Sequence, residues 1–173
     1  MSAAALHLVD PEEPAATYVE TDFRDAMGRF ASGIVVVTAI VDNAPVGFTC
    51  QSFSSLSLMP ALVLFCASRG STSWQRMKGA EAFSINVLGE SQQDVSAQFA
   101  QRNDDKFAGR RWQPGTNGAP HLAGALVHID CRRYDVVAQG DHDIVVGQVE
   151  HTAVRTTGRP LLYFRGTYDT LAW

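Results

Sequence analysis

A hydroxyl- and amide-rich segment between two apolar runs has the clearest capacity for binding chemistry. Residues 46–58 read VGFTCQSFSSLSL, and the run ALVLFC follows at 61–66. Hydroxyl, amide and backbone N–H groups donate hydrogen bonds to a phosphate or to the carbonyl edge of a heterocycle without carrying charge. The same composition is typical of the polar end of a plain hairpin. On these residues alone, both interpretations stay open.

A histidine between two acidic residues is the second candidate for chemistry. His142 lies in the sequence GDHD at 140–143, directly before the apolar run IVVG. An imidazole in this position titrates near neutral pH and can donate a hydrogen bond to a ligand, or it only solvates a turn. A catalytic triad is not predicted here, because adjacent side chains point to opposite sides of an extended chain.

Metal and disulfide sites are not expected. His121, His128 and His151 are scattered, without the HxH or HExxH spacing of metal ligands. The sequence has no CxxC pair, and its three cysteines lie in apolar surroundings at Cys50, Cys66 and Cys131. Reduced thiols in a cytoplasmic protein are therefore expected.

The composition fits one domain with an acidic balance. The chain has 173 residues, a formal net charge of −4 and a pI near 5.7, which argues against nucleic acid as the main partner. No apolar run approaches the roughly 20 residues that cross a bilayer, so no membrane association is expected. The acidic N-terminal region is unlike the basic start of a signal peptide. Residues 1–20 are expected to form a flexible arm and residues 21–173 the folded domain.

Three helices are expected around these candidates, at 22–33, 71–78 and 91–102. Asp22 and Ser91 are the predicted N-caps of the first and third helices, since short polar side chains accept the free N–H groups of a first turn. The apolar face of the first helix contains Phe23, Met27 and Phe30.

Runs of β-branched residues between turn residues predict strands. The first is expected at 34–40, with a turn at 42–45 into a second strand that begins at Val46 and ends in the polar turn. The segment 112–120 is expected to be a surface loop. Many strands, short turns and few helices favour a closed antiparallel barrel over a parallel α/β sheet. The remaining strands are expected at 62–66, 83–88, 126–137, 143–151 and 161–168.

The nucleotide-binding signatures GxGxxG and GxxxxGK[ST] are absent from the sequence, as is the GxSxG nucleophile elbow. Instead, five short motifs resemble the short-chain flavin reductase family in their order and spacing. They are FRxxMxxFxxG at 23–33, GFTxxSF at 47–53, NVL at 86–88, DKF at 105–107 and GDH at 140–142. The resemblance runs from about residue 22 to the C-terminus and implies a mainly β fold with peripheral helices, the FMN-binding split β-barrel, built as a homodimer.

The resemblance also implies binding residues by position. The flavin ring and ribityl chain would be lined by Pro45, Val46, Gly47, Phe48, Thr49, Gln51 and Ser52, and next by Cys66, Ala67 and Ser68. The phosphate would meet Thr72 and Ser73, and Lys106 is a further candidate for it. The distal part of the flavin would meet Gln98 and Phe99, and the nicotinamide would meet Tyr163 and the catalytic candidate His142. Many relatives have Lys or Arg where this chain has Gln98, which leaves FMN or FAD open.

The implied reaction is hydride transfer from NADH or NADPH to FMN or FAD, with free reduced flavin supplied to a separate monooxygenase. The cofactor performs the transfer, and the protein supplies stacking and orientation. Two alternatives remain open: a split-barrel protein that holds flavin or haem without turnover, and an enzyme like pyridoxamine-phosphate oxidase. The GDH turn favours the reductase, because a pure flavin carrier needs no group on the nicotinamide side.

Overall fold

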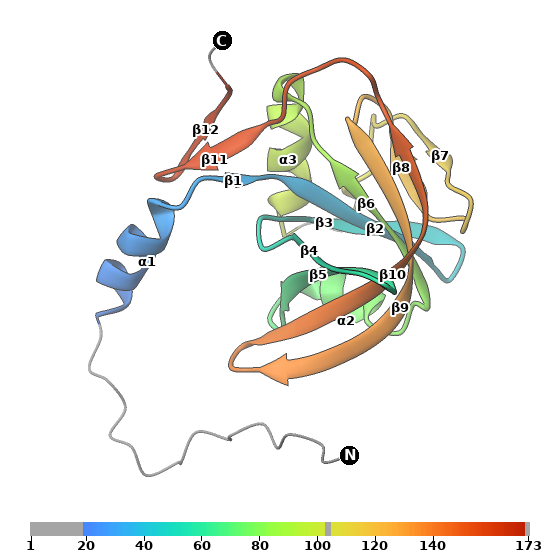
Figure 1. Ribbon diagram of the computed structural model, residues 1–173, viewed down its shortest axis with the longest axis horizontal. Helices are drawn as coiled ribbons and strands as arrows, with labels where there is room; N and C mark the ends of the chain where they lie inside the picture. The colour runs from blue at the N-terminus through green and yellow to red at the C-terminus, as the bar shows by residue number, and fades with distance from the viewer. Residues whose placement is uncertain (1–18, 103–104, 172–173) are drawn as a thin grey trace.

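The computed structural model describes residues 19–102 and 105–171, and its centre is a seven-stranded antiparallel sheet with the strand order β3-β2-β6-β9-β10-β5-β4 (Figure 1). The strands of this sheet are β2 (Val35–Val41), β3 (Ala44–Cys50), β4 (Ser54–Leu58), β5 (Ala61–Ser68), β6 (Ala82–Val87), β9 (Val127–Gln139) and β10 (His142–Val154). Strands β3 and β4 are the two edges of the sheet. The strongly curved sheet therefore stays split between them.

Two small sheets and three helices surround the large sheet. The small sheets are β1 (Ser32–Gly33) with β11 (Leu162–Phe164) and β12 (Thr167–Asp169), and β7 (Trp112–Pro114) with β8 (Pro120–Leu122). The helices are α1 (Glu20–Gly28), α2 (Thr72–Met77) and α3 (Gln93–Ala100), with a 3-10 turn at Glu90–Gln92 before α3. The prediction of a mainly β fold with peripheral helices is confirmed.

The hairpin of β2 and β3 follows directly from its sequence. Val35–Val41 is rich in β-branched residues, which favour an extended backbone. Asp42 and Asn43 adopt φ values of 51° and 60°, the left-handed conformation that a two-residue hairpin turn requires and that Asp and Asn tolerate. The turn is shorter than predicted, and Pro45 already lies in β3, where an edge strand tolerates its missing N–H.

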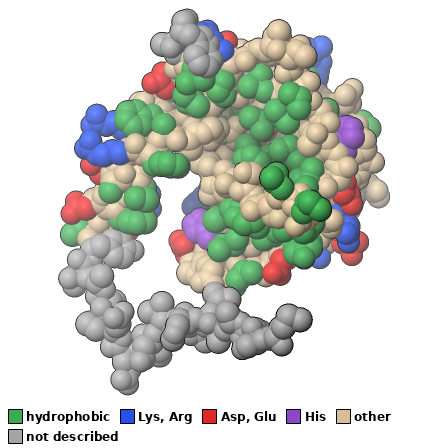
Figure 2. Space-filling model, viewed as in Figure 1, with side chains coloured by type: hydrophobic (Ala, Val, Ile, Leu, Met, Phe, Trp, Pro, Cys, Tyr) green, Lys and Arg blue, Asp and Glu red, His purple; other side chains and the backbone are tan. Residues whose placement is uncertain are grey.

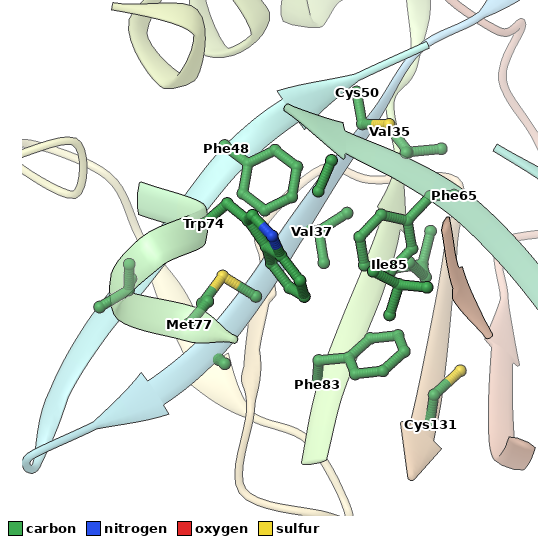
Figure 3. Close-up of a cluster of buried hydrophobic side chains, with 14 of the residues drawn as sticks. Val35, Val37, Phe48, Cys50, Phe65, Trp74, Met77, Phe83, Ile85 and Cys131 are labelled. Carbon is green, nitrogen blue, oxygen red and sulfur yellow. The ribbon is translucent and has the colours of Figure 1, made fainter. Parts of the chain in front are cut away.

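An aromatic cluster fixes α2 against the sheet. The rings of Phe48, Phe65, Trp74 and Phe83 meet edge to face, with centroids 5.5 Å apart for Phe65 and Phe83 and 6.2 Å apart for Phe65 and Trp74 (Figure 3). Each such pair contributes about 0.5–1.5 kcal/mol beyond the burial of its area. Trp74 is the member from α2, so this packing sets where the first turn of α2 lies.

A second cluster fixes α3 on the other part of the barrel. Phe99 is fully buried with Ile34, Val36 and Leu88. Its ring also packs over the backbone of Gly47, where a Cβ would meet a Phe99 ring carbon at 2.9 Å. Glycine is therefore required in β3 because α3 packs directly on the strand.

The first helix differs from its prediction. It begins at Glu20 with Val19 as N-cap and ends at Gly28, so the predicted cap at Asp22 is wrong and the end near Gly33 is too late. The N–H of Asp22 already donates to the carbonyl of Val19, which places Asp22 inside the first turn. Residues 1–18 of the predicted arm lie outside the described residues.

The remaining differences concern short elements with weak local signals. Ser91 lies in the 3-10 turn and does not cap α3; the Gln92 side chain accepts the N–H of Gly89 instead. The polar stretch after Cys50 contains strand β4, and the expected loop at 112–120 contains β7 and the start of β8. The strand expected at 161–168 is a hairpin, because the chain turns at Arg165 and Gly166 with positive φ values.

Candidate functional site

A small hollow lies where β3, α2 and the segment after α3 meet. Its walls are formed by Pro45, Val46, Gly47, Thr72, Ser73, Arg76, Lys106 and Phe107, and it encloses about 10 Å³. Six of these residues were predicted from the sequence, although they come from three separate segments. Arg76 and Phe107 were missed. The signal for Arg76 was its place four residues after Thr72, which puts both side chains on one face of α2.

Lys106 is the chemically distinctive group of this hollow. Its side chain is only 7% exposed, and its Nζ donates to the carbonyl oxygen of Phe99 at 2.9 Å. Among the described residues it forms no ion pair, and burial lowers the pKa of its ammonium group. A buried charge without a counter-charge costs free energy that an entering anion offsets. The hollow therefore suits an anionic group.

Two predicted hydroxyls are already bonded inside the protein. Thr49 Oγ1 donates to the carbonyl of Ser96 in α3 at 2.7 Å. Ser52 Oγ donates to the carbonyl of Cys66 at 3.0 Å and accepts the N–H of the same residue at 2.9 Å. Thr49 thus ties β3 to α3, and Ser52 ties the end of β3 to β5. Gln51, which was also predicted to line the flavin, has an exposed side chain.

Other predicted residues lie behind the hollow and position its walls. Phe48, Phe99 and Ala67 are core residues, exposed by 7%, 0% and 1%. Gln98 holds the segment that contains Lys106: its Nε2 donates to the carbonyls of Lys106 and Ala108, at 3.0 and 2.9 Å. The structure places Gln98 beneath this segment.

His142 stands at the start of β10, opposite Ser68 of β5. Its Nδ1 lies 2.7 Å from Asp141 Oδ1, so the expectation that neighbouring side chains point apart is wrong here. The reason is that Asp141 belongs to the turn, where the alternation of a strand does not hold. Hydrogen bonding to His142 lowers the pKa of the Asp141 carboxyl. The carboxylate therefore accepts, and Nδ1 carries the proton.

The turn that presents His142 is tied to α2. The carboxylate of Asp143 accepts the indole N–H of Trp74 at 2.7 Å and lies 3.7 Å from Arg69 Nε. The Arg69 side chain and backbone N–H also donate to the turn carbonyls of Gly140 and Asp141. The position of His142 is thus coupled to the helix that forms one wall of the hollow.

Tyr163 does not line the hollow in this chain. It lies in β11 opposite Ser32, and its ring meets Tyr168 edge to face at 5.3 Å. It packs against the buried cluster around Phe99.

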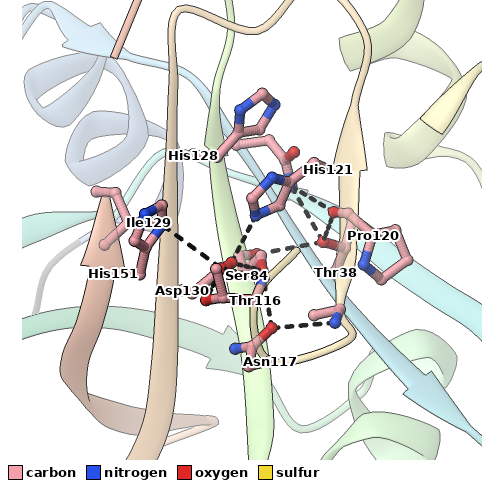
Figure 4. A network of polar contacts seen from close by, with 12 residues as sticks. Thr38, Ser84, Thr116, Asn117, Pro120, His121, His128, Ile129, Asp130 and His151 are labelled. Carbon is pink, nitrogen blue, oxygen red and sulfur yellow. Dashed lines mark hydrogen bonds and ion pairs between the residues drawn. The ribbon is translucent and has the colours of Figure 1, made fainter. Parts of the chain in front are cut away.

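A buried polar network, which was not predicted from the sequence, joins β6, β8 and β9. Asp130 is fully buried, and its carboxylate accepts from Ser84 Oγ, from His121 Nε2 at 2.6 Å, and from the N–H and hydroxyl of Thr116 at 2.8 and 2.7 Å (Figure 4). Burial alone would raise the pKa of Asp130, but these hydrogen bonds outweigh it and lower the pKa to about 2. The network holds the β7–β8 hairpin on the barrel.

The histidines that are scattered in the sequence meet at this network. The rings of His121 and His128 stack 4.2 Å apart and within 4° of parallel, and His128 Nε2 donates to the carbonyl of Leu122 at 3.0 Å. Within residues 19–102 and 105–171, no three His, Cys, Asp or Glu side chains gather as a metal site.

Comparison with known proteins gives a family match over most of the chain. The model of the flavin reductase like domain matches residues 27–172. The reductase subunit HsaB of a flavin-dependent monooxygenase from Mycobacterium tuberculosis is 47% identical over 148 residues, which are 84% of this chain and 79% of the relative. The HsaB reductase subunit of Rhodococcus jostii is 42% identical over 166 residues, 96% of this chain and 80% of the relative.

Solved structures show the same fold. Component B of a nitrilotriacetate monooxygenase from Mycobacterium thermoresistibile superposes with a TM-score of 0.85 at 44% identity, over 88% of this chain and 86% of its own. The NADH:FAD oxidoreductase SgcE6 of Streptomyces globisporus, in complex with NAD and FAD fragments, has a TM-score of 0.84 at 32% identity, over 96% and 98% of the two chains. The predicted split-barrel fold is therefore confirmed.

Proposed function

Because this chain belongs to the flavin reductase family, we propose that it is the reductase component of a two-component monooxygenase. It oxidises NADH, reduces FMN or FAD and supplies the free reduced flavin to a separate oxygenase. The relatives favour NADH over NADPH, since one is named FMN reductase (NADH) and another NADH:FAD oxidoreductase. The same names include both FMN and FAD, so either flavin is kept as the cofactor.

The buried ammonium of Lys106 carries this proposal. It has no ion-pair partner among the described residues, and it shares the hollow with the guanidinium-bearing Arg76 and the hydroxyl-bearing Thr72 and Ser73. This donor set fits the phosphate of a flavin. The hollow holds about 10 Å³, space for little more than one water molecule, so the phosphate would lie at its mouth and the ring outside it, along the exposed end of β3 towards Gln51.

A bound flavin would supply the ring that takes up hydride from the nicotinamide. The residues of this chain hold and orient the reactants. Lys106, Arg76 and Thr72 bind phosphate, and Pro45 and Val46 form the floor next to it. The site is open, and two of its predicted hydroxyl groups, those of Thr49 and Ser52, are hydrogen-bonded within the protein. Such a site binds flavin loosely, which suits a protein that releases its product to another enzyme.

His142 orients the nicotinamide in this proposal. Because Nδ1 is hydrogen-bonded to Asp141, Nε2 is the ring nitrogen left to bond a ligand. That atom is suited to the carboxamide of a nicotinamide. The side chain is 43% exposed, so it is open to a second substrate.

A second copy of the chain completes the assembly that we propose. The apolar side chains of Phe23 and Met27 in α1 are 54% and 55% exposed, and that of Phe30, just after the helix, is 80% exposed. Leu58 and Met59 on the barrel are each 92% exposed. Figure 2 shows α1 standing away from the barrel, with a hollowed space between them and hydrophobic side chains on the barrel face. Exposed apolar area on this scale marks a protein interface. A homodimer would bury it.

No helix within the described residues is long and apolar enough to cross a membrane. Cys50, Cys66 and Cys131 are free thiols, which supports the cytoplasm as the proposed compartment.

The decisive experiment follows NADH absorbance with added FMN or FAD. We expect NADH to be consumed only when flavin is present, and reduced flavin to reach an added monooxygenase. A protein that binds flavin without any flavin-dependent loss of NADH would instead be a carrier. Oxidation of pyridoxamine phosphate without NADH would indicate the other alternative.

A further inference from the structure

A second hollow, separate from that around Lys106, lies between the β7–β8 hairpin and the start of β9. It encloses about 380 Å³ and shares no wall residue with the first hollow. The residues that form its walls include two arginines and three residues with flat rings, namely Arg111, Arg155, Trp112, His121 and His128. Small-molecule sites begin at about 300 Å³, so this space is large enough for a small ligand.

The charge of this hollow is positive in a chain whose net charge is −4. Within the part of the chain that the structure describes, neither Arg111 nor Arg155 forms an ion pair with a carboxylate; Arg155 Nη1 donates to the carbonyl of Gly124 at 3.0 Å. Asp130 lies beneath the hollow, fully buried, with its charge taken up by four donors. Two guanidinium groups are thus left to meet an anion.

The walls of the hollow are flat and firmly held. His121 and His128 stack nearly parallel, and burial lowers the pKa of His128, so that its ring is neutral at neutral pH. Trp112 is 37% exposed and adds an indole. The Asp130 network beneath fixes His121 (Figure 4). Preorganised walls lower the entropy cost of binding.

We propose that this hollow binds a planar aromatic carboxylate, and that its occupancy changes the affinity of the flavin site. Guanidinium groups pair with a carboxylate through two parallel hydrogen bonds, and flat aromatic walls favour a flat ring. The ring of Trp112 meets that of Phe107 at 6.1 Å, and Phe107 also lines the hollow around Lys106. The second half of this proposal rests on the proposed flavin site.

Calorimetric titration of the full chain without flavin tests whether the second hollow binds an aromatic carboxylate. We expect benzoate to bind. Two control ligands should bind at least about tenfold more weakly: benzamide lacks the charge, and cyclohexanecarboxylate lacks the flat ring. The double variant Arg111→Gln, Arg155→Gln should lose about tenfold or more in benzoate affinity. Arg132→Gln, at an exposed site elsewhere, is the matched control and should bind as the wild type does.

Circular dichroism and melting curves would establish that each variant is folded. Equal affinity for benzoate and benzamide, or undiminished benzoate binding by the folded double variant, would overturn the site.

The proposed coupling between the second hollow and the flavin site is tested by measuring the affinity for each ligand in the presence of the other. The dissociation constant of FMN is measured with and without saturating benzoate, and that of benzoate with and without saturating FMN. Both should change by one common factor of at least about two, because coupling between two sites is reciprocal. Unchanged constants would overturn the coupling. A protein that fails to bind FMN at all would contradict the proposed function, while the benzoate titration would still decide the second hollow.

Discussion

Two polar regions of this molecule show how polar groups that stabilise the fold differ from polar groups that can bind a ligand. Around Asp130, each carboxylate oxygen meets donors from the protein, and the group is fully buried. Around Lys106, a buried ammonium meets one carbonyl oxygen, forms no ion pair among the described residues, and borders a hollow. Both regions draw residues from several segments.

The difference is whether the protein itself supplies the hydrogen-bond partners or counter-charge of the buried group. A network that is satisfied by the protein rigidifies the fold, whereas a buried charge that lacks a counter-charge stores free energy that a ligand releases. We therefore expect substitutions at Asp130 to act on stability, and substitutions at Lys106 to act on binding.

The largest effect is expected for Asp130→Asn. Its amide presents a donor to groups that are themselves donors, so four hydrogen bonds lose their charged acceptor. We expect a loss of about 3–5 kcal/mol in the free energy of unfolding, measured by urea denaturation. Asp135→Asn, at an exposed position in β9, is the control and should change it little. A loss below about 1 kcal/mol at Asp130 would show that the network does not hold the hairpin.

The same carboxylate predicts a dependence on pH. The pKa of Asp130 is about 2 in the folded chain against an ordinary 3.8. Its contribution to stability is therefore complete above the ordinary value and is lost as the pH falls towards about 2. Unfolding free energies measured across this window should decline more steeply for the wild type than for Asp130→Asn. Parallel curves would assign the acid sensitivity to other groups.

Lys106→Met should separate binding from stability. The loss of a charge-assisted hydrogen bond to phosphate predicts at least about tenfold weaker FMN binding. The melting temperature should hold or rise, because an ammonium that is costly to bury has been replaced by an apolar side chain. Fluorescence titration and thermal melts measure the two quantities, with the exposed Lys78→Met as control. A lower melting temperature with unchanged FMN affinity would make Lys106 a structural residue.

His142→Ala should affect the nicotinamide substrate selectively. We expect the apparent KM for NADH to rise several-fold and that for flavin to change less, because the side chain lies at the start of β10, beside β5, and outside the hollow around Lys106. Steady-state kinetics with each substrate varied in turn give both values. An unchanged KM for NADH would refute this placement.

The smallest effect is expected at Ser52, where two substitutions divide packing from binding. Ser52→Ala removes both hydrogen bonds to Cys66 and should cost about 1 kcal/mol of stability. Ser52→Leu adds bulk at the end of β3 and should also weaken flavin binding. Wild-type flavin affinity in the folded Leu variant would count against this part of the site.

The sequence predicted the long strands well, because their signals are local. The residues around the hollow were instead implied by the family resemblance, and their role in binding stays a prediction. The β-branched run of β2 and the turn residues Asp42 and Asn43 determine that hairpin within a few residues. Short elements were missed for the same reason. Strand β4 consists of Ser and Leu residues with little strand preference, and it forms because β5 offers a partner edge.

The sequence alone determined a mainly β domain and a region rich in hydrogen-bonding groups at the end of β3, since residue type and periodicity decide both. Only the tertiary structure decided which of those groups stay available. Thr49 and Ser52 bond internally because α3 and β5 come within reach, whereas Lys106 is buried at a hollow without an ion-pair partner among the described residues. Hydrogen bonding depends on distances between segments far apart in the chain, and those distances exist only in the folded protein.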